Sequence, residues 1–302
     1  MVIASVVMSL VAAASVMADD EVVAPVIVDQ PKSVNVKAGA RVTFSVNAVE
    51  TTDSREDFTA GLPGAYMDMI YCAPGSFTMG SSTNELGRID QEDLHKVTLT
   101  QGFWLGKYEV TQAQYQAIMG TNPSYFKGAD LPVEYVAWED AMEFCAKLTE
   151  IEKAAGRLPK GYEYTLPTEA QWEYACRAGT TTALNSGKNL SSEEKCPEMD
   201  EVGWYGYNTA NKTHPVGQKL PNAWGLYDMH GNVLEWCLDL YNTRGYPSSE
   251  VIDPIGTTGI MRVVRGGSYA RSDAGRCRSA YRLSGTIGFR DSGFRVALAP
   301  VK

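Results

Sequence analysis

The sequence predicts an α+β fold with few helices and long structured loops. The chain has 302 residues, of which 44% are apolar, and it contains 28 Gly and 16 Tyr. Helical periodicity is confined to three segments, while short segments of alternating polar and apolar residues occur near both ends of the main body. Between them, residues 179–225 are rich in Gly, Asn and Pro. This pattern is typical of a mixed fold and not of a helical bundle.

The first 18 residues are predicted to be a signal peptide. An apolar run extends from Val2 to Val16, and Val16 and Ala18 occupy the −3 and −1 positions of a signal-peptidase site. The run is shorter than the ~20 residues of a membrane helix. No Lys or Arg precedes it, so an uncleaved anchor or a buried segment remains an alternative. We expect a secreted, periplasmic or cell-envelope protein that has no membrane attachment after cleavage.

Residues 19–65 are predicted to form a hairpin and a linker. Residues 25–49 alternate with period two around a Lys-Ala-Gly-Ala turn, which indicates two paired strands. These resemble the first strands of an immunoglobulin-like domain, but no room remains for the others. Residues 50–64 are expected to be a polar connector.

The main domain is expected over residues 66–302. It opens with two strands around a Pro-Gly turn, in MIYCAPGSFTMGS, and a further alternating segment, KVTLTQGFWLGKYEVT, ends at Thr111. Strand-like segments return in MRVVRGGSY and GFRVALAP.

Three helices are expected in this domain. Thr111 with Gln114, and Thr168 with Gln171, each form a T-x-x-Q capping box, so a helix begins after each threonine. Gly120 is expected to end the first of them. The segment 138–156 places its apolar residues on one face and predicts the remaining helix.

Composition excludes several classes of function. The net charge of −9 and pI near 5.0 argue against nucleic-acid binding, which requires a basic face. The chain has only three histidines, His95, His214 and His230, and it lacks HExxH and Cys-x-x-Cys zinc motifs. We expect His230, in a turn beside Asp228, to be a plain surface residue.

Eight separated blocks resemble the formylglycine-generating enzyme, or sulfatase-modifying factor, family. They cover roughly residues 70–299, and the resemblance implies a C-type-lectin-like core with little regular secondary structure. The blocks are GSFTMGS, YEVTQAQYQ, LPVEYVAWEDAMEFC, LPTEAQWEYACRAGT, NAWGLYDMHGNVLEW, VVRGGSY, CRSAYR and GFRVA.

The resemblance also implies where a copper site should lie. The namesake enzymes hold copper(I) with two thiolates shortly after a Gly-Gly-Ser-aromatic segment, and Ser268 matches their active-site serine. In this chain Arg271 and Arg276 occupy the two thiolate positions. A guanidinium has only hydrogen-bond donors and cannot ligate copper. The sequence therefore predicts a divergent member that lacks the copper site.

The segment 225–236 is expected to bind calcium. Family members bind this ion at the positions of Asp228, Gly231, Val233 and Glu235, through two side chains and two backbone carbonyls. Calcium prefers such oxygen ligands, and its role would be structural. The alternative is that Asp228 caps a turn and Glu235 pairs with an arginine.

Cysteine chemistry follows from the expected export. Cys176 and Cys277 match positions that are bridged in the family, and an oxidising compartment favours disulfides. Cys145 matches another bridged position whose partner is Val296, so Cys145 is expected to be a buried thiol. The pairing of Cys72, Cys196 and Cys237 stays open.

Two classes of function remain. The first is a calcium-stabilised binding module without copper chemistry, whose protein, peptide or anionic ligand would meet a surface near Tyr269, Arg271 and Arg276. The second is an oxidoreductase of the same family, including one that generates formylglycine on a sulfatase cysteine.

Overall fold

The computed structural model describes residues 26–27, 48–49, 56–62, 64–247, 249–270, 273–285 and 288–301. The chain divides into two units, Met1–Arg55 and Glu56–Lys302. In the first unit, β1 (Val26–Ile27) pairs antiparallel with β2 (Ala48–Val49), as expected for a hairpin. The predicted signal peptide and the Lys-Ala-Gly-Ala turn lie outside the described residues.

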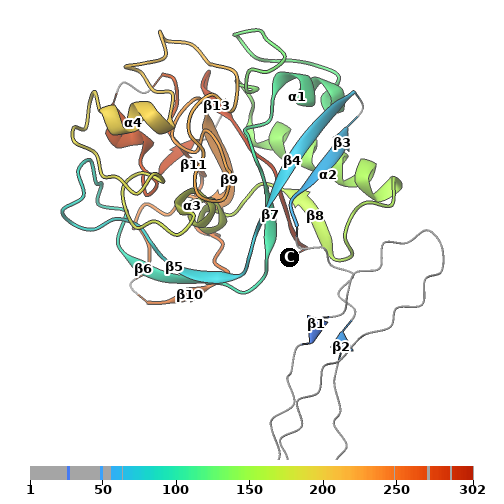
Figure 1. The fold of residues 1–302 in the computed structure, drawn as a ribbon, viewed down its shortest axis with the longest axis horizontal. Coiled ribbons are helices and arrows are strands. Elements are labelled where there is room, and N and C mark those ends of the chain that lie inside the picture. The colour runs from blue at the N-terminus through green and yellow to red at the C-terminus, as the bar shows by residue number, and fades with distance from the viewer. Residues whose placement is uncertain are drawn as a thin grey trace, which may run out of the picture. The chain divides into compact units, whose positions relative to one another are not determined.

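The second unit is built on a five-stranded antiparallel sheet (Figure 1). Its order is β3-β4-β7-β14-β8, so β14, the last of the described strands, lies between two strands that come more than 130 residues before it. The strands are β3 (Phe58–Leu62), β4 (Ala65–Cys72), β7 (Phe103–Gly106), β14 (Ala297–Pro300) and β8 (Tyr162–Thr165).

The expected domain boundary at residue 66 is wrong. Strand β3 pairs with β4 along its whole length, from Phe58↔Met69 to Leu62↔Ala65. Buried Ala60 and Leu62 belong to the main hydrophobic core. The residues expected to be a polar connector therefore supply an edge strand, and the domain already begins near Phe58.

The helices confirm the capping predictions. Thr111 and Thr168 each close a capping box with the glutamine three residues later, and Gly120 ends the first helix with φ 76°. Helix α2 buries Ala141, Phe144 and other apolar residues against the sheet. The helices are α1 (Gln112–Met119), α2 (Trp138–Ala154), α3 (Glu169–Arg177) and the short α4 (Pro197–Val202).

Two smaller sheets carry the other strands. In the four-stranded sheet the order is β12-β11-β9-β13, and in the three-stranded sheet it is β10-β6-β5. The strands of the first are β12 (Leu283–Gly285), β11 (Arg262–Arg265), β9 (Leu234–Leu240) and β13 (Ser292–Gly293). The strands of the second are β10 (Val251–Ile252), β6 (His95–Leu99) and β5 (Gly75–Met79).

Three apolar clusters fill the second unit. One lies between the five-stranded sheet and helices α1 and α2, a second surrounds Trp172 of α3, and a third lies under the irregular segment 183–205. Among the described residues, no helix is both long and apolar enough to cross a membrane. The predicted α+β class with long loops is confirmed.

Candidate functional site

Ser268 is buried and hydrogen-bonded to a carboxylate. Strand β11 leads into Gly266 and Gly267, whose φ angles of 88° and 75° favour glycine. A Cβ on Gly267 would lie 2.3 Å from Cys277 Sγ, so no larger residue fits there. The turn places Ser268 inside the protein, where its hydroxyl donates to Asp291 Oδ2. Sequence reasoning found no partner for Ser268, because Asp291 is distant in the chain.

Of the two arginines expected at the thiolate positions, the structure places only Arg276. Arg271 lies outside the described residues. Arg276 is exposed in the 3₁₀ helix Ala274–Cys277, and its Nε lies 2.9 Å from Asp273 Oδ2. Tyr269 is 3% exposed, so the expected ligand surface near this residue does not include its ring.

The predicted Cys176–Cys277 disulfide is not formed. No disulfide is present, and all six cysteines, Cys72, Cys145, Cys176, Cys196, Cys237 and Cys277, are buried, as expected only for Cys145. The imidazole of His230 contacts both residues, with Nε2 3.9 Å from Cys176 Sγ and Nδ1 2.7 Å from the Cys277 carbonyl oxygen. Burial raises the pKa of Cys176 to about 12, so this thiol is protonated.

His230 is fully buried, and the expectation of a surface histidine is wrong. The Asn185 N–H donates to its Nε2 over 3.0 Å, which leaves Nδ1 to donate to the Cys277 carbonyl. Burial lowers the pKa of His230 to about 4, so the ring is neutral near pH 7. The ring joins three loops of the chain.

Asp228 retains an unused carboxylate oxygen. Its backbone has φ 56°, and its side chain is 1% exposed. Oδ2 accepts the Gly217 N–H over 2.7 Å, while Oδ1 is buried and has no hydrogen-bond partner among the described residues. Gly231, at φ 120°, lies so close to Trp204 that a Cβ would be 2.1 Å from its carbonyl oxygen. The turn is therefore tightly constrained around Asp228.

The Glu235 carboxylate accepts hydrogen bonds from other side chains, including an arginine, which is the alternative that the sequence left open. Arg295 donates to both carboxylate oxygens, over 2.6 Å from Nε and 2.7 Å from Nη2. The Trp172 indole N–H adds a third bond of 2.7 Å. Any metal bound by Glu235 would share its oxygens with these donors.

Sequence reasoning missed Glu109, which completes a buried acidic cluster with Asp228 and Glu235. Its carboxylate accepts the Val233 N–H over 2.9 Å and the Asn232 side-chain amide over 2.7 Å. Burial, with Asp228 and Glu235 nearby, raises the pKa of Glu109 well above its usual range. Burial raises the pKa of Asp228 to about 6, against the opposing effects of the Gly217 N–H, Arg295 and Lys219.

Within the part of the chain that the structure describes, no three His, Cys, Asp or Glu side chains form a metal-binding group. A cation at Asp228 would therefore depend on backbone carbonyls for most of its ligands. Calcium accepts such ligands, and the unused Asp228 oxygen fits it.

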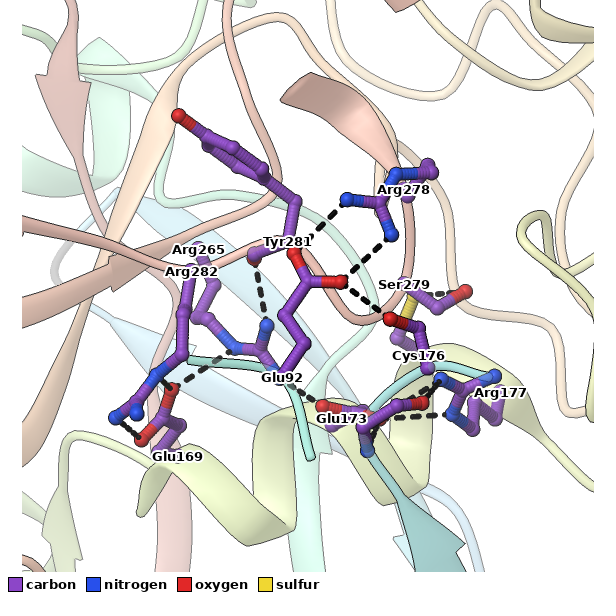
Figure 2. Close-up of polar contacts among 12 residues, drawn as sticks. Glu92, Glu169, Glu173, Cys176, Arg177, Arg265, Arg278, Ser279, Tyr281 and Arg282 are labelled. Atoms are coloured by element: carbon purple, nitrogen blue, oxygen red, sulfur yellow. Dashed lines mark hydrogen bonds and ion pairs between the residues drawn. The ribbon is translucent and has the colours of Figure 1, made fainter. Parts of the chain in front are cut away.

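A second charged cluster surrounds helix α3 and is rich in arginine (Figure 2). Glu173 accepts hydrogen bonds from Arg177 and Arg265, and Glu169 accepts two from Arg282 at 2.8 and 2.6 Å. Arg278 pairs in the same bidentate way with Glu92, at 2.8 Å for both bonds. These contacts join the 85–92 loop, α3 and the 265–282 segment.

A surface pocket of about 320 Å³ lies beside the N-terminus of α3. It is distinct from the turn around Ser268, because its lining includes neither Ser268 nor Asp291. The lining residues are Leu99, Gln101, Thr168, Gln171, Asp253, Pro254, Pro300 and Val301.

Comparison with known proteins identifies the family. The family model of the sulfatase-modifying factor enzyme 1-like domain matches residues 58–300. A chaperone protein LppX of Paenibacillus barcinonensis is 33% identical over 220 residues, which are 58% of this chain and 72% of that protein. The formylglycine-generating enzyme of Streptomyces coelicolor is 37% identical over 180 residues, 53% of this chain and 51% of the enzyme.

Solved structures agree with this assignment. Variable protein 1 of Treponema denticola superposes with a TM-score of 0.71 at 31% identity, covering 81% of this chain and 99% of that one. PvdO from Pseudomonas aeruginosa gives 0.63 at 28% identity, covering 76% and 94%. The fold around Ser268, Asp228 and α3 is thus that of the formylglycine-generating enzymes, and the chain belongs to the sulfatase-modifying factor family.

Proposed function

We propose that this chain is an exported binding protein of the family that does not perform copper-dependent oxidation. The proposal rests on Arg271 and Arg276, which by the family resemblance are expected at the positions of the copper thiolates. Copper(I) prefers thiolate ligands, and a guanidinium offers no lone pair. Arg276 is moreover exposed and paired with Asp273.

Four of the six thiols support the same conclusion. Burial raises the pKa values of Cys72, Cys145, Cys176 and Cys237, and metal binding requires the thiolate form. The Paenibacillus relative is named a chaperone protein and not an oxidase.

Calcium is the cofactor that we propose, with a structural role. Glu109, Asp228 and Glu235 place three carboxylates near the single guanidinium of Arg295. A divalent cation at Asp228 would balance this excess of negative charge, held by the unused Oδ1 with the carbonyls of Gly231 and Val233. Glu235 would remain paired with Arg295 and would attract the cation electrostatically without binding it. The bound ion would fix the 228–235 turn.

An oxidoreductase is the second candidate, because the Streptomyces enzyme is 37% identical. One experiment separates the two. The purified protein is supplied with copper(I), oxygen and a thiol peptide containing Cys-x-Pro-x-Arg, and the peptide mass is followed. We expect no aldehyde in the peptide and no copper(I) tightly bound to the protein.

The matched control is the double variant Arg271→Cys/Arg276→Cys, which restores two thiols at the expected positions. We expect this variant to retain copper(I) where the unsubstituted chain does not. Conversion of the peptide by the unsubstituted chain would contradict the proposal.

A further inference from the structure

An exposed group of two tyrosines and one arginine lies near the buried Ser268–Asp291 pair. Tyr125 is 62% exposed and Tyr135 is 56% exposed. The guanidinium carbon of Arg290, which is also exposed, lies 4.6 Å from the centre of the Tyr125 ring. We call Tyr125, Tyr135 and Arg290 the tyrosine–arginine surface.

Buried contacts hold Tyr125 in place. The Glu134 carboxylate accepts the Phe126 N–H over 2.8 Å, and the Glu134 N–H donates to Ser124 Oγ over 3.0 Å. The loop that carries Tyr125 is thus attached, on both sides of this residue, to the segment that carries Tyr135. Phe126 also packs edge-on against Tyr269, with ring centres 5.5 Å apart. A surface built in this way loses little conformational entropy when it binds.

Tyr135 adopts a backbone conformation that its side chain does not favour. Its φ is 65°, in the left-handed region, which is unusual for a bulky residue. Its neighbours Glu134 and Val136 are fully buried, so the strained turn directs Tyr135 outward between them. Gly or Asn would adopt this angle more easily. Such strain concentrates at functional positions, and the exposed ring contributes little to the core.

Arg290 differs from the buried arginines. Arg177, Arg265, Arg278, Arg282 and Arg295 all pair with carboxylates. Arg290 stacks on an aromatic ring instead, and no carboxylate of the described residues forms an ion pair with it. Stacking leaves the edge of a guanidinium free to bind a carboxylate with two hydrogen bonds.

We propose that the tyrosine–arginine surface docks another protein, which presents an Asp or Glu beside an apolar or aromatic side chain. This inference rests on the proposed binding function and names its partner class. The carboxylate would bind Arg290, and the apolar side chain would pack on Tyr125 and Tyr135. The 320 Å³ pocket is lined by other residues, and an exposed surface of this kind suits a protein partner better than a small molecule. Tyr and Arg dominate the binding energy of protein interfaces.

A random peptide display library tests the proposal. Selection on the unsubstituted protein, with counter-selection on the variant Tyr125→Ser/Tyr135→Asn/Arg290→Gln, should enrich peptides with Asp or Glu next to a large apolar residue. Single substitutions Arg290→Gln and Tyr135→Asn should each weaken an enriched peptide by about tenfold or more. In the Arg290→Gln variant, replacing the acid of the peptide by its amide should weaken peptide binding little further, because the partner of the acid is already absent.

Controls separate binding from folding. Tyr135→Asn should leave the melting temperature unchanged or raise it, because Asn tolerates the positive φ. Tyr66→Ser and Arg244→Gln, at an exposed tyrosine and arginine elsewhere, should leave peptide binding unchanged.

The proposal is overturned if enriched peptides lack acids, if they bind the triple variant equally well, or if none is enriched. Copper turnover by the unsubstituted chain would instead refute the proposed function, so the two failures are distinguishable.

Discussion

Two buried charged clusters of this protein differ in how their carboxylates are balanced. Around α3, Glu85, Glu92, Glu169 and Glu173 face Arg177, Arg265, Arg278 and Arg282. Around the 228–235 turn, Glu109, Asp228 and Glu235 share Arg295, with Lys219 a weaker influence. In the first cluster, the four glutamates are balanced by the four arginines. The second keeps an excess of negative charge, which a cation or protons must balance.

The largest effect is expected from breaking the arginine-rich cluster. Glu173→Ala would leave Arg177 and Arg265 buried without their main partner, so we expect a loss of about 3–5 kcal/mol in the free energy of unfolding. Urea denaturation would measure it. The matched control is Glu143→Ala, which removes an exposed pair with Lys147 and should cost less than about 1 kcal/mol. Equal losses in the two variants would show that the buried cluster is not special.

The acidic cluster should give a dependence on pH and calcium. Because burial raises the pKa of Asp228 to about 6, its ionisation destabilises the calcium-free fold as pH rises from about 4 to 6. His230, with its pKa lowered to about 4, acts in the opposite direction, because the unfolded chain binds a proton below about pH 6.5. Glu109, whose pKa burial also raises, acts in the same direction as Asp228, so the two acids oppose His230 in the chelated protein.

Asp228→Asn removes the contribution of Asp228 to the pH dependence of stability and should make the opposite contribution of His230 easier to measure. With EDTA, the free energy of unfolding of the variant should rise between about pH 4 and 6 by about 3 kcal/mol more than that of the unsubstituted protein, because the opposing contribution of Asp228 is gone. Calcium should restore the rise in the unsubstituted protein, because the ion keeps Asp228 ionised. Urea titrations at several pH values test this. Identical curves with calcium and EDTA would contradict calcium binding.

The smallest effect is expected at the start of α3. Thr168→Ala removes the N-cap oxygen that accepts the Gln171 N–H, and should cost about 1 kcal/mol. Thr111→Ala at α1, a helix outside the arginine-rich cluster, serves as the comparison and should cost the same. A much larger loss at Thr168 would mean that the cap also positions Glu169 and Glu173 for their arginines. Thermal melting of both variants measures the difference.

Local interactions explain which parts of the fold were predictable. The capping boxes at Thr111 and Thr168 involve residues three apart, so the sequence located both helix starts. Strand β9 was missed, because its pattern is buried on both faces and does not alternate. Its position after the Gly231-Asn232 turn also favoured a loop.

The candidate site was predictable only in part. Asp228, Glu235 and Ser268 were found from the family motifs, but their partners Arg295 and Asp291 lie far away in the sequence. Glu109 was missed for the same reason. The contacts of the buried His230 with the Cys176 thiol and the Cys277 carbonyl were missed as well, because they join positions that are far apart in the sequence.

The position of β14 has a consequence for biosynthesis. This strand pairs with β7 on one side and β8 on the other, so the five-stranded sheet stays divided until residues 297–300 have been made (Figure 1). The nascent chain therefore cannot complete this sheet until residues 297–300 have left the ribosome. For a polypeptide that crosses a membrane before folding, as proposed here, this dependence would keep the sheet open until β14 has been translocated.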